Sequence, residues 1–600
     1  MTRFRLVLGA LAGLTAGAHA QTANGPIPAP VAKYQVAIQK DVMVPMRDGI
    51  RLATDIYRPE GAGDRLPVIL MRTPYNKATY GGATAPAAFF ASQGYTVVTQ
   101  DVRGQYGSEG FYRVQLADAR DGYDAIDWIV KQPWATANVG MYGCSYLGEV
   151  QYLLSARRHP ALKAMIPQAA SGATGSAGDY YTNFGTYDGG ALTLSSIFGW
   201  FGFAGHRIRA PANTAVGISN VPKINFAAML KTLPTATLAE RAGFPLSDFK
   251  DFVTHPPADP YWAPIGYLKD TDEFDTPALH VNSWLDVTPE QTLHVANLMR
   301  MNAATARGRD NQFVIMSPTT HCGSERAGNP TKVGDREFGD SRQPYFQIYL
   351  DWFDHWLKGV DNGVTRRPKF QYYVMGENRW RESPSWPVPG MKQVNYYLSA
   401  TGALEPRLPV GGSQNFVYDP ANPLPSRGGT ICCTGNPADQ PGIFDQTDLE
   451  TRPDLLVYST PVLTKPVTMA GTVSATIYLG SNAKDTDLVA KLIDVDEQGR
   501  SWNVVSGIKR VRYRNGMATP AFMEPGQIYP VTISLKATAY RFLPGHRIRL
   551  WISSSDFPMY DRNLNTGGDN VTETTWVKAT NTLHYGSKQA SVLVLPLLPE

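Results

Sequence analysis

One serine stands in a setting that could make it a nucleophile. The segment 139–148, VGMYGCSYLG, predicts an apolar strand that enters a tight, glycine-flanked turn at Ser145 and continues as a helix. A turn of this kind holds the hydroxyl clear of the backbone, where an acyl group can reach it. A serine hydroxyl is a weak nucleophile until a base removes its proton, so the chain must also supply a base and an acid that orients the base.

Asp286 and His321 are the candidate acid and base. Asp286 follows a predicted strand that ends near Trp284, and His321 follows the next predicted strand along the chain. Ligands of an open α/β sheet meet the carboxyl ends of its strands, so both side chains are expected at that edge. The alternative for Asp286 is a helix cap, because Thr288-Pro289-Glu290 is typical of a helix start.

The other nine histidines are less well placed to act as the base. They lie in the N-terminal segment, before Asp286, within predicted helices, or in the C-terminal β region (His19; His159, His206, His255, His280; His294, His355; His546, His584). His321 alone follows an apolar strand after Asp286. We therefore expect His321 to remove the Ser145 proton and return it to the leaving group, with Asp286 holding the imidazole tautomer.

Two groups could stabilise the oxyanion that forms during acyl transfer. The backbone N–H of Tyr146 follows the nucleophile directly, which is the usual position of one donor. The second donor is expected in the loop 72–77, RTPYNK, after the strand 66–71. Spacing alone leaves Tyr75 of that loop as either a packing residue or a catalytic one.

The elements that position these residues read as an α/β-hydrolase core in two parts, residues 35–166 and 269–384. Short apolar runs at 66–71, 95–100, 277–282 and 312–316 indicate buried parallel strands. Helices are predicted over 122–132 and 345–358, and a hairpin is predicted at residues 41–57. Alternating strands and helices imply right-handed crossovers and a doubly wound sheet.

Two further regions depart from this alternation of strands and helices. Residues 167–268 are rich in Gly, Ala, Tyr and Phe, with a helix predicted over 226–233, and are interpreted as an inserted helical cap. Residues 385–600 show short alternating strands separated by Gly, Pro, Asn and Asp, which predicts an all-β sandwich of the jelly-roll type.

Composition and charge narrow the class of protein. The net charge is +4, of which Arg3 and Arg5 contribute two, so neither a nucleic-acid partner nor an anionic membrane surface is expected. Residues 1–20 predict a signal peptide cut after Ala20, and hence a periplasmic or secreted protein. A small-molecule ester or amide is the expected substrate, and whether the chain forms a homo-oligomer stays open.

The four cysteines, Cys144, Cys322, Cys432 and Cys433, fit no disulfide scaffold and no zinc template. They permit three pairings, among which the sequence cannot choose. No histidine pair has metal-ligand spacing and no Gly-rich phosphate loop occurs, so no metal and no organic cofactor are expected.

With these residues in place, the chain resembles the family of cocaine esterase, X-Pro dipeptidyl-peptidase and α-amino acid ester hydrolase, which includes glutaryl-cephalosporin acylases. The resemblance is carried by short motifs across the α/β portion (RTPY at 72–75, DVRG at 101–104, GSEG at 107–110, GCSYLG at 143–148, HP at 159–160, WLD at 284–286 and the His321 loop). It implies a hydrolase core with a cap and a jelly roll, and it implies that the Tyr75 hydroxyl is the second oxyanion donor.

One departure bears on specificity. The α-amino acid ester hydrolases resembled here bind the substrate ammonium with a carboxylate cluster, part of which follows the catalytic Asp. Here the uncharged Val287-Thr288-Pro289 follows Asp286, and Asp179 is the one cluster position retained, with a cap role as its alternative. We therefore expect a serine esterase or acylase that works through an acyl-enzyme. An X-Pro dipeptidyl-peptidase or α-amino acid ester hydrolase is the alternative, and a non-catalytic ligand-binding protein is a third hypothesis.

Overall fold

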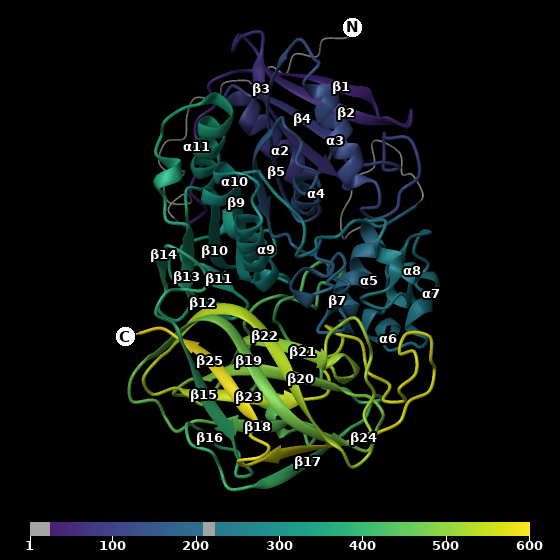
Figure 1. Cartoon of the computed structure of the whole chain (residues 1–600), viewed down its shortest axis with the longest axis vertical. Coiled ribbons are helices and arrows are strands. Elements are labelled where there is room, and N and C mark those ends of the chain that lie inside the picture. Colours follow the sequence, from purple (N-terminus) through teal and green to yellow (C-terminus); the bar gives the residue numbers. More distant parts are fainter. Residues whose placement is uncertain (1–23, 208–221, 600) are drawn as a thin grey trace.

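The computed structural model describes residues 24–207 and 222–599 (Figure 1). The expected signal segment 1–20 and part of the expected cap, 208–221, lie outside these residues. Within the described ranges, no helix has the length and apolar character needed to cross a bilayer.

A ten-stranded sheet forms the core of the α/β portion, in the order β1-β2-β4-β3-β5-β6-β9-β10-β13-β14. The strands from β4 to β13 in this order run parallel, and β1, β2 and β14 join antiparallel at the two edges. Every residue of β3, β4 and β9 is buried, as expected for strands covered on both faces. The strands span β1 Val36–Pro45, β2 Arg51–Pro59, β3 Leu66–Thr73, β4 Thr96–Asp101, β5 Ala135–Cys144, β6 Leu162–Gln168, β9 Ala278–Leu285, β10 Gln312–Thr320, β13 Phe370–Val374 and β14 Arg379–Ser383.

Helices cover both faces of this sheet. Helix α3 packs against α4 on one face, while α2 meets α11 on the other through the Phe90 and Phe353 rings, whose centroids are 5.5 Å apart. On β5, a Cβ at Gly140 would lie 2.6 Å from the Phe353 ring, so the strand and α11 approach closely. The core helices are α2 Gly81–Ser92, α3 Asp118–Ile129, α4 Tyr146–Ser155, α9 Pro289–Met301, α10 Ala306–Asp310 and α11 Tyr345–Lys358.

The cap follows β6 and precedes β9 in the chain, and it contacts the C-terminal region (Figure 1). Its described part combines short helices with a small hairpin, and its aromatic core joins the hydrophobic core of the sheet. The elements are β7 Tyr187–Asp188, β8 Ala191–Leu192, α5 Leu194–Phe203, α6 Phe226–Leu230, α7 Leu238–Arg241 and α8 Phe249–Thr254.

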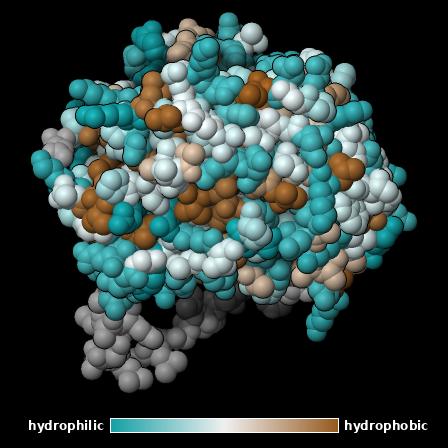
Figure 2. Space-filling view, turned by 90° about the horizontal axis from the view of Figure 1, so that it is seen from below, coloured by the Kyte–Doolittle hydropathy of each residue, from teal (hydrophilic) through white to brown (hydrophobic). Residues whose placement is uncertain are grey.

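The C-terminal region is built from two antiparallel sheets with a second hydrophobic core between them. Its outer end carries separate apolar patches among hydrophilic side chains (Figure 2). One sheet contains β15 Lys392–Leu398, β16 Leu404–Glu405, β17 Gly412–Tyr418, β19 Val467–Ser481, β22 Ile528–Phe542, β24 Ala579–Tyr585 and β25 Val592–Leu597; the other contains β18 Leu456–Ser459, β20 Asp487–Val495, β21 Ser501–Arg510 and β23 Arg547–Ser553.

The predicted fold class, an α/β-hydrolase core with a helical cap and a β domain, is confirmed. Three details differ from the sequence prediction. Strand β6 was not predicted, α3 begins four residues earlier than expected, and α6 ends at Leu230 rather than at residue 233. The last difference has a local cause, because Pro234 follows closely and a residue before proline avoids the helical conformation.

Candidate active site

Ser145 occupies a sharp turn between β5 and α4. Its φ of 62° and ψ of −129° lie outside the regions that a non-glycine residue prefers, a conformation that costs about 1–3 kcal/mol and is typical of functional sites. Glycine is required on both sides: a Cβ at Gly143 would lie 2.4 Å from Leu147 Cβ, and one at Gly148 would lie 2.7 Å from Ala170 Cβ. Gly148 therefore permits the close approach of α4 to the chain that leaves β6.

The structure brings Asp286 and His321 together at the carboxyl ends of β9 and β10. His321 Nδ1 lies 2.9 Å and 3.1 Å from the two carboxylate oxygens of Asp286, which is fully buried. Burial would lower the pKa of His321, but the charge of Asp286 and the hydrogen bond to it raise that pKa to about 9. The opposite ring nitrogen, Nε2, is buried and has no hydrogen-bond partner among the described residues. His321 and Ser145 line the same pocket.

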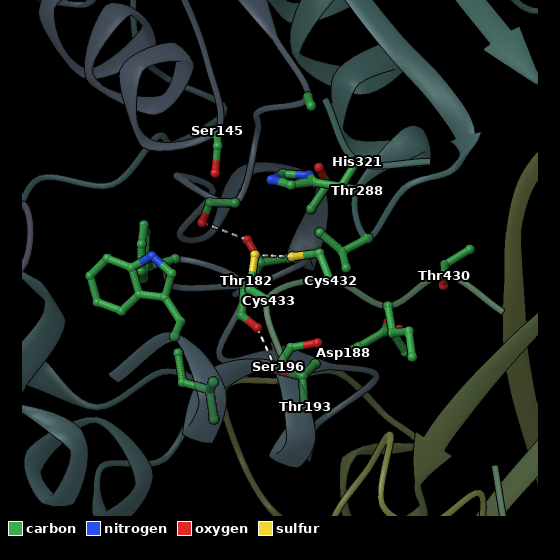
Figure 3. Close-up of a pocket in the computed structure, with 18 of the residues that line it drawn as sticks. Ser145, Thr182, Asp188, Thr193, Ser196, Thr288, His321, Thr430, Cys432 and Cys433 are labelled. Carbon is green, nitrogen blue, oxygen red and sulfur yellow. Dashed lines mark hydrogen bonds between the residues drawn. The ribbon is translucent and has the colours of Figure 1, made fainter. Parts of the chain in front are cut away.

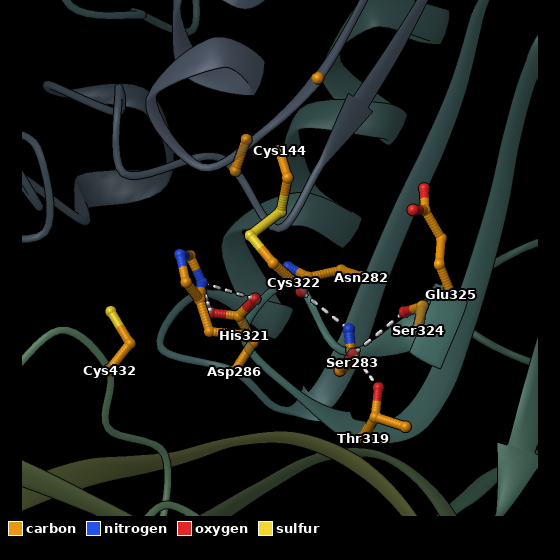
Figure 4. The surroundings of a disulfide bond; sticks show 12 residues. Cys144, Asn282, Ser283, Asp286, Thr319, His321, Cys322, Ser324, Glu325 and Cys432 are labelled. Atoms are coloured by element: carbon orange, nitrogen blue, oxygen red, sulfur yellow. Dashed lines mark hydrogen bonds and ion pairs between the residues drawn. A yellow bond between two sulfur atoms is a disulfide. The ribbon is translucent and has the colours of Figure 1, made fainter. Parts of the chain in front are cut away.

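A disulfide links the two loops that carry Ser145 and His321 (Figure 4). Cys144 directly precedes Ser145 and Cys322 directly follows His321, and the two cysteines are 178 positions apart in the chain. The sequence left this pairing open among three. The bond ties the nucleophile turn to the histidine loop by a covalent route that does not pass through Asp286.

Tyr75 and Tyr146, the two candidate oxyanion donors, lie close together, with ring centroids 6.3 Å apart. The Trp200 indole N–H donates to the Tyr75 hydroxyl at 3.0 Å, so the Tyr75 proton is free to point elsewhere. Burial raises the pKa of Tyr75 well above its usual value, as do the charges of Tyr80 and Cys433, while hydrogen bonds with Trp200 and Ser145 lower it. Tyr146 is the first residue of α4, where the backbone N–H has no partner within the helix.

A small cavity of about 80 Å³ opens beside Ser145 and His321 (Figure 3). All three parts of the chain form its wall. The sheet region supplies Glu149 and Thr288, the cap supplies Phe184 and Trp200 among others, and the β domain supplies residues 430–433 with Lys536, Met559 and Tyr560. Sequence reasoning did not identify the wall from the β domain, because no local pattern signals how distant parts of a chain pack.

Three charged side chains in the pocket were also missed. Burial raises the pKa of Glu149 to about 7, although its carboxylate accepts backbone N–H groups from Gly172 and Ala173 at 2.8 and 2.7 Å. Glu149 stands four positions after Ser145, one helical turn on, and this spacing could have identified it. Asp188 and Lys536 form an ion pair of 3.0 Å in the same wall.

Asp179 is not placed to bind a substrate, and this expectation requires correction. Its side chain is exposed, is not part of the pocket wall, and accepts the Met517 backbone N–H at 3.3 Å. It joins the cap to the β domain instead. The nearby hairpin β7–β8 turns Asp188, rather than Asp179, toward the pocket, where the Tyr560 hydroxyl donates to it at 2.7 Å.

Comparisons with known proteins match both the α/β portion and the C-terminal portion of the chain. A family model described as X-Pro dipeptidyl-peptidase (S15 family) matches residues 48–323. A second, described as X-Pro dipeptidyl-peptidase C-terminal non-catalytic domain, matches residues 362–594. Cocaine esterase of Rhodococcus sp. (strain MB1 Bresler) is 35% identical to this chain, over 94% of it and 99% of the esterase.

Two solved structures share the whole architecture. An α-amino acid ester hydrolase superposes with a TM-score of 0.78 at 27% identity, covering 95% of this chain and 98% of its own. An aminopeptidase from a marine sediment archaeon, Thaumarchaeota archaeon, superposes with a TM-score of 0.78 at 24% identity, covering 96% and 99%. At that identity the second likeness shows the fold alone.

Proposed function

This chain belongs to the hydrolase family of cocaine esterase and the S15 X-Pro dipeptidyl-peptidases, and we propose that it cleaves small carboxylic esters or amides through an acyl-enzyme on Ser145. The observation that carries the proposal is that Ser145 and His321 line one cavity while Asp286 holds His321. Asp286 holds His321 by Nδ1, and Nε2 has no hydrogen-bond partner in the described part of the chain. His321 and Ser145 line the same cavity, with Ser145 on a strained turn.

The tautomer of the His321 imidazole determines which nitrogen accepts the proton. Because Nδ1–H is donated to Asp286, neutral His321 carries its lone pair on Nε2, the atom that would accept the Ser145 proton. The imidazolium formed in this way is stabilised by the buried Asp286 carboxylate. It then protonates the leaving group, and a water activated by the same Nε2 releases the acyl group from Ser145.

We assign the oxyanion site to the Tyr75 hydroxyl and the Tyr146 backbone N–H. The Trp200 indole fills one lone pair of the Tyr75 oxygen and so directs its proton away from the indole, toward Ser145. A donor fixed in advance gives more stabilisation than water because it need not reorganise during the reaction.

The shape and chemistry of the cavity support a small acyl group without an ammonium. Its volume of about 80 Å³ is small beside the roughly 300–1,000 Å³ typical of sites for drug-sized ligands. The carboxylate of Asp188 already accepts from the Lys536 ammonium and the Tyr560 hydroxyl. A substrate ammonium would have to displace Lys536 from Asp188.

An X-Pro dipeptidyl-peptidase or an α-amino acid ester hydrolase is the second candidate. The family match and the half-buried carboxylate of Asp188 in the pocket wall favour it, whereas the ion pair with Lys536 and the uncharged residues 287–289 weigh against it. Hydrolysis of X-Pro-nitroanilide faster than of p-nitrophenyl acetate or butyrate, in terms of kcat/KM, would establish this candidate in place of the esterase.

The test of the chemistry is a pair of variants in one helix region. Ser145→Ala should abolish hydrolysis of p-nitrophenyl esters and labelling by a fluorophosphonate, while Ser155→Ala, at the far end of α4, should keep both. Mass spectrometry of a rapidly quenched reaction should find the acyl mass on the peptide that contains Ser145. Full turnover by Ser145→Ala would exclude the mechanism.

We also propose that the chain is exported, with cleavage after Ala20. The Cys144–Cys322 disulfide supports this proposal, because structural disulfides persist in oxidising compartments. Expression of the whole sequence in a Gram-negative host, followed by N-terminal sequencing of the periplasmic fraction, should give a chain that begins at Gln21. A full-length chain confined to the cytoplasm would contradict export.

A further inference from the structure

Two free thiols face the catalytic cavity from the β domain. Cys432 and Cys433 both line the pocket, and their Sγ atoms lie 2.7 Å apart. Neighbouring residues of an extended chain point to opposite sides, but Cys433 has a φ of 62°, which turns both side chains the same way. The cap holds this loop in place, since a Cβ at Gly199 would lie 2.3 Å from the Cys433 carbonyl oxygen.

A third potential ligand, His321, faces the two sulfurs. One ligand atom from each of His321, Cys432 and Cys433 can be chosen so that all three lie within 4.8 Å of one another. His321 Nε2 is buried without a hydrogen-bond partner among the described residues, and Nδ1 is held by Asp286. A carboxylate on the far nitrogen is the arrangement found for histidines that bind metals, because it fixes the tautomer and raises ligand basicity.

We propose that His321 Nε2, Cys432 Sγ and Cys433 Sγ form a binding site for a soft divalent cation such as Zn²⁺, and that a cation bound there switches hydrolysis off. The spacing of these residues in the chain predicts no metal site, because the two thiols are adjacent and the histidine lies more than one hundred positions earlier. The site exists only where the β domain meets the sheet edge.

The chemistry of the site favours soft cations. Each thiol releases a proton on binding, and two thiolates with a neutral imidazole balance the charge of one divalent ion in this half-buried position. Sulfur ligands select Zn²⁺ or Cd²⁺ over Mg²⁺ or Ca²⁺. At Zn–S distances of about 2.3 Å in a tetrahedron, the sulfurs must separate by about 1 Å from their present contact, and the fourth position stays open to the cavity.

Inhibition follows from the identity of the third ligand. A cation on Nε2 occupies the lone pair that would accept the Ser145 proton, and it fills space that an acyl group needs. This half of the inference rests on the proposed function, whereas the binding itself does not. The two halves can therefore be tested separately.

Binding is tested by titrating the reduced-thiol protein with Zn²⁺ in a calorimeter and with Cd²⁺ in an ultraviolet spectrometer. Mass spectrometry first establishes that Cys432 and Cys433 are thiols and that Cys144–Cys322 is intact. We expect one ion per chain and a thiolate-to-cadmium absorption band. Cys432→Ser, Cys433→Ser and His321→Gln should each weaken binding by more than the roughly 10- to 100-fold that loss of a residue merely hydrogen-bonded to a ligand costs.

The matched control is Thr434→Ser, in the same loop but outside the pocket wall, which should bind Zn²⁺ like the wild type. Equal binding by the wild type and Cys432→Ser/Cys433→Ser would place the ion elsewhere and overturn the proposal, as would undiminished binding by His321→Gln. A Cys432–Cys433 disulfide that persists under mild reduction, with no ion bound, would also overturn it.

Activity is scored as the ratio of rates with and without Zn²⁺, so that each variant is its own reference. The wild-type ratio should fall at least tenfold and recover with a chelator, while the ratio of the double cysteine variant stays near one. An enzyme that binds Zn²⁺ but hydrolyses no ester or amide would refute the proposed function and leave the site established. A wild-type enzyme that binds Zn²⁺ at His321 and keeps its full rate would refute the switch.

Discussion

The Tyr75 hydroxyl offers the sharpest test of the oxyanion assignment. Tyr75→Phe removes one hydroxyl and keeps the ring that packs against Tyr80, whose centroid is 5.0 Å away. Loss of one oxyanion donor raises the barrier by about 2.7–4 kcal/mol, so we expect kcat to fall about 100- to 1,000-fold with little change in KM. Stopped-flow and steady-state kinetics on p-nitrophenyl esters measure both constants.

The same change has a separate cost in stability, because it leaves the buried Trp200 N–H without its acceptor. An orphaned buried donor costs about 1–3 kcal/mol, and removing both partners costs much less. Trp200→Phe removes that donor but also buried ring area, so the double variant should lose less unfolding free energy than the two single variants together, and it should recover none of kcat. Urea unfolding followed by tryptophan fluorescence and far-ultraviolet circular dichroism measures the first quantity.

Tyr80→Phe is the matched control, since it removes a phenol hydroxyl from the ring that packs against Tyr75, and its kcat should stay within a few-fold of the wild type. A Tyr75→Phe enzyme with kcat within threefold of the wild type would refute the oxyanion role. A double variant that regains kcat would show that the loss came from a displaced loop and not from a missing donor.

Three further predictions concern the groups around Ser145. Asp286→Asn should lower kcat by about 10⁴ while circular dichroism stays unchanged, because His321 loses the partner that fixes its tautomer; a loss below tenfold would contradict the assignment. Burial lowers the pKa of His321, but the charge of Asp286 and the hydrogen bond to it raise that pKa to about 9. Because His321 must be neutral to act as a base, kcat/KM should rise with pH through about 9. A pH profile that is already level at neutral pH would count against this prediction. Replacing Cys144 and Cys322 by serine should lower the unfolding free energy by about 5 kcal/mol, the chain-entropy value for a loop of this length, and calorimetry that finds no shift in Tm would refute it.

The position of the candidate acid and base could be predicted because it depends on local pattern and one rule of topology. Apolar runs mark β9 and β10, and parallel neighbours in a sheet end at the same edge. A residue directly after each strand therefore lies close to its counterpart, as the 2.9 Å contact between Asp286 and His321 illustrates.

The cavity wall could not be predicted, because it depends on how the three parts of the chain dock. Nothing local distinguishes Lys536 or Cys432 from other residues of a β domain. The position of Asp179 could not be predicted either, although Asp179 and Asp188 lie on one segment of the cap. The hairpin β7–β8 decides which of the two carboxylates lines the pocket, and this hairpin carries no strong sequence pattern. The Cys144–Cys322 pairing likewise follows only after the nucleophile turn and the histidine loop have met.

The shared wall of the cavity makes the β domain part of what the enzyme can recognise. A chain cut after the sheet region would still hold Ser145 and His321, yet the cavity beside them would lose the part of its wall that includes Tyr560 and Met559. Selection for a new substrate can therefore act on loops that never touch the reacting bond. If the β domain were replaced by that of a relative, the preference of the enzyme for one acyl group over another should change with it. The sheet region and the β domain are therefore expected to be inherited together and to diversify together.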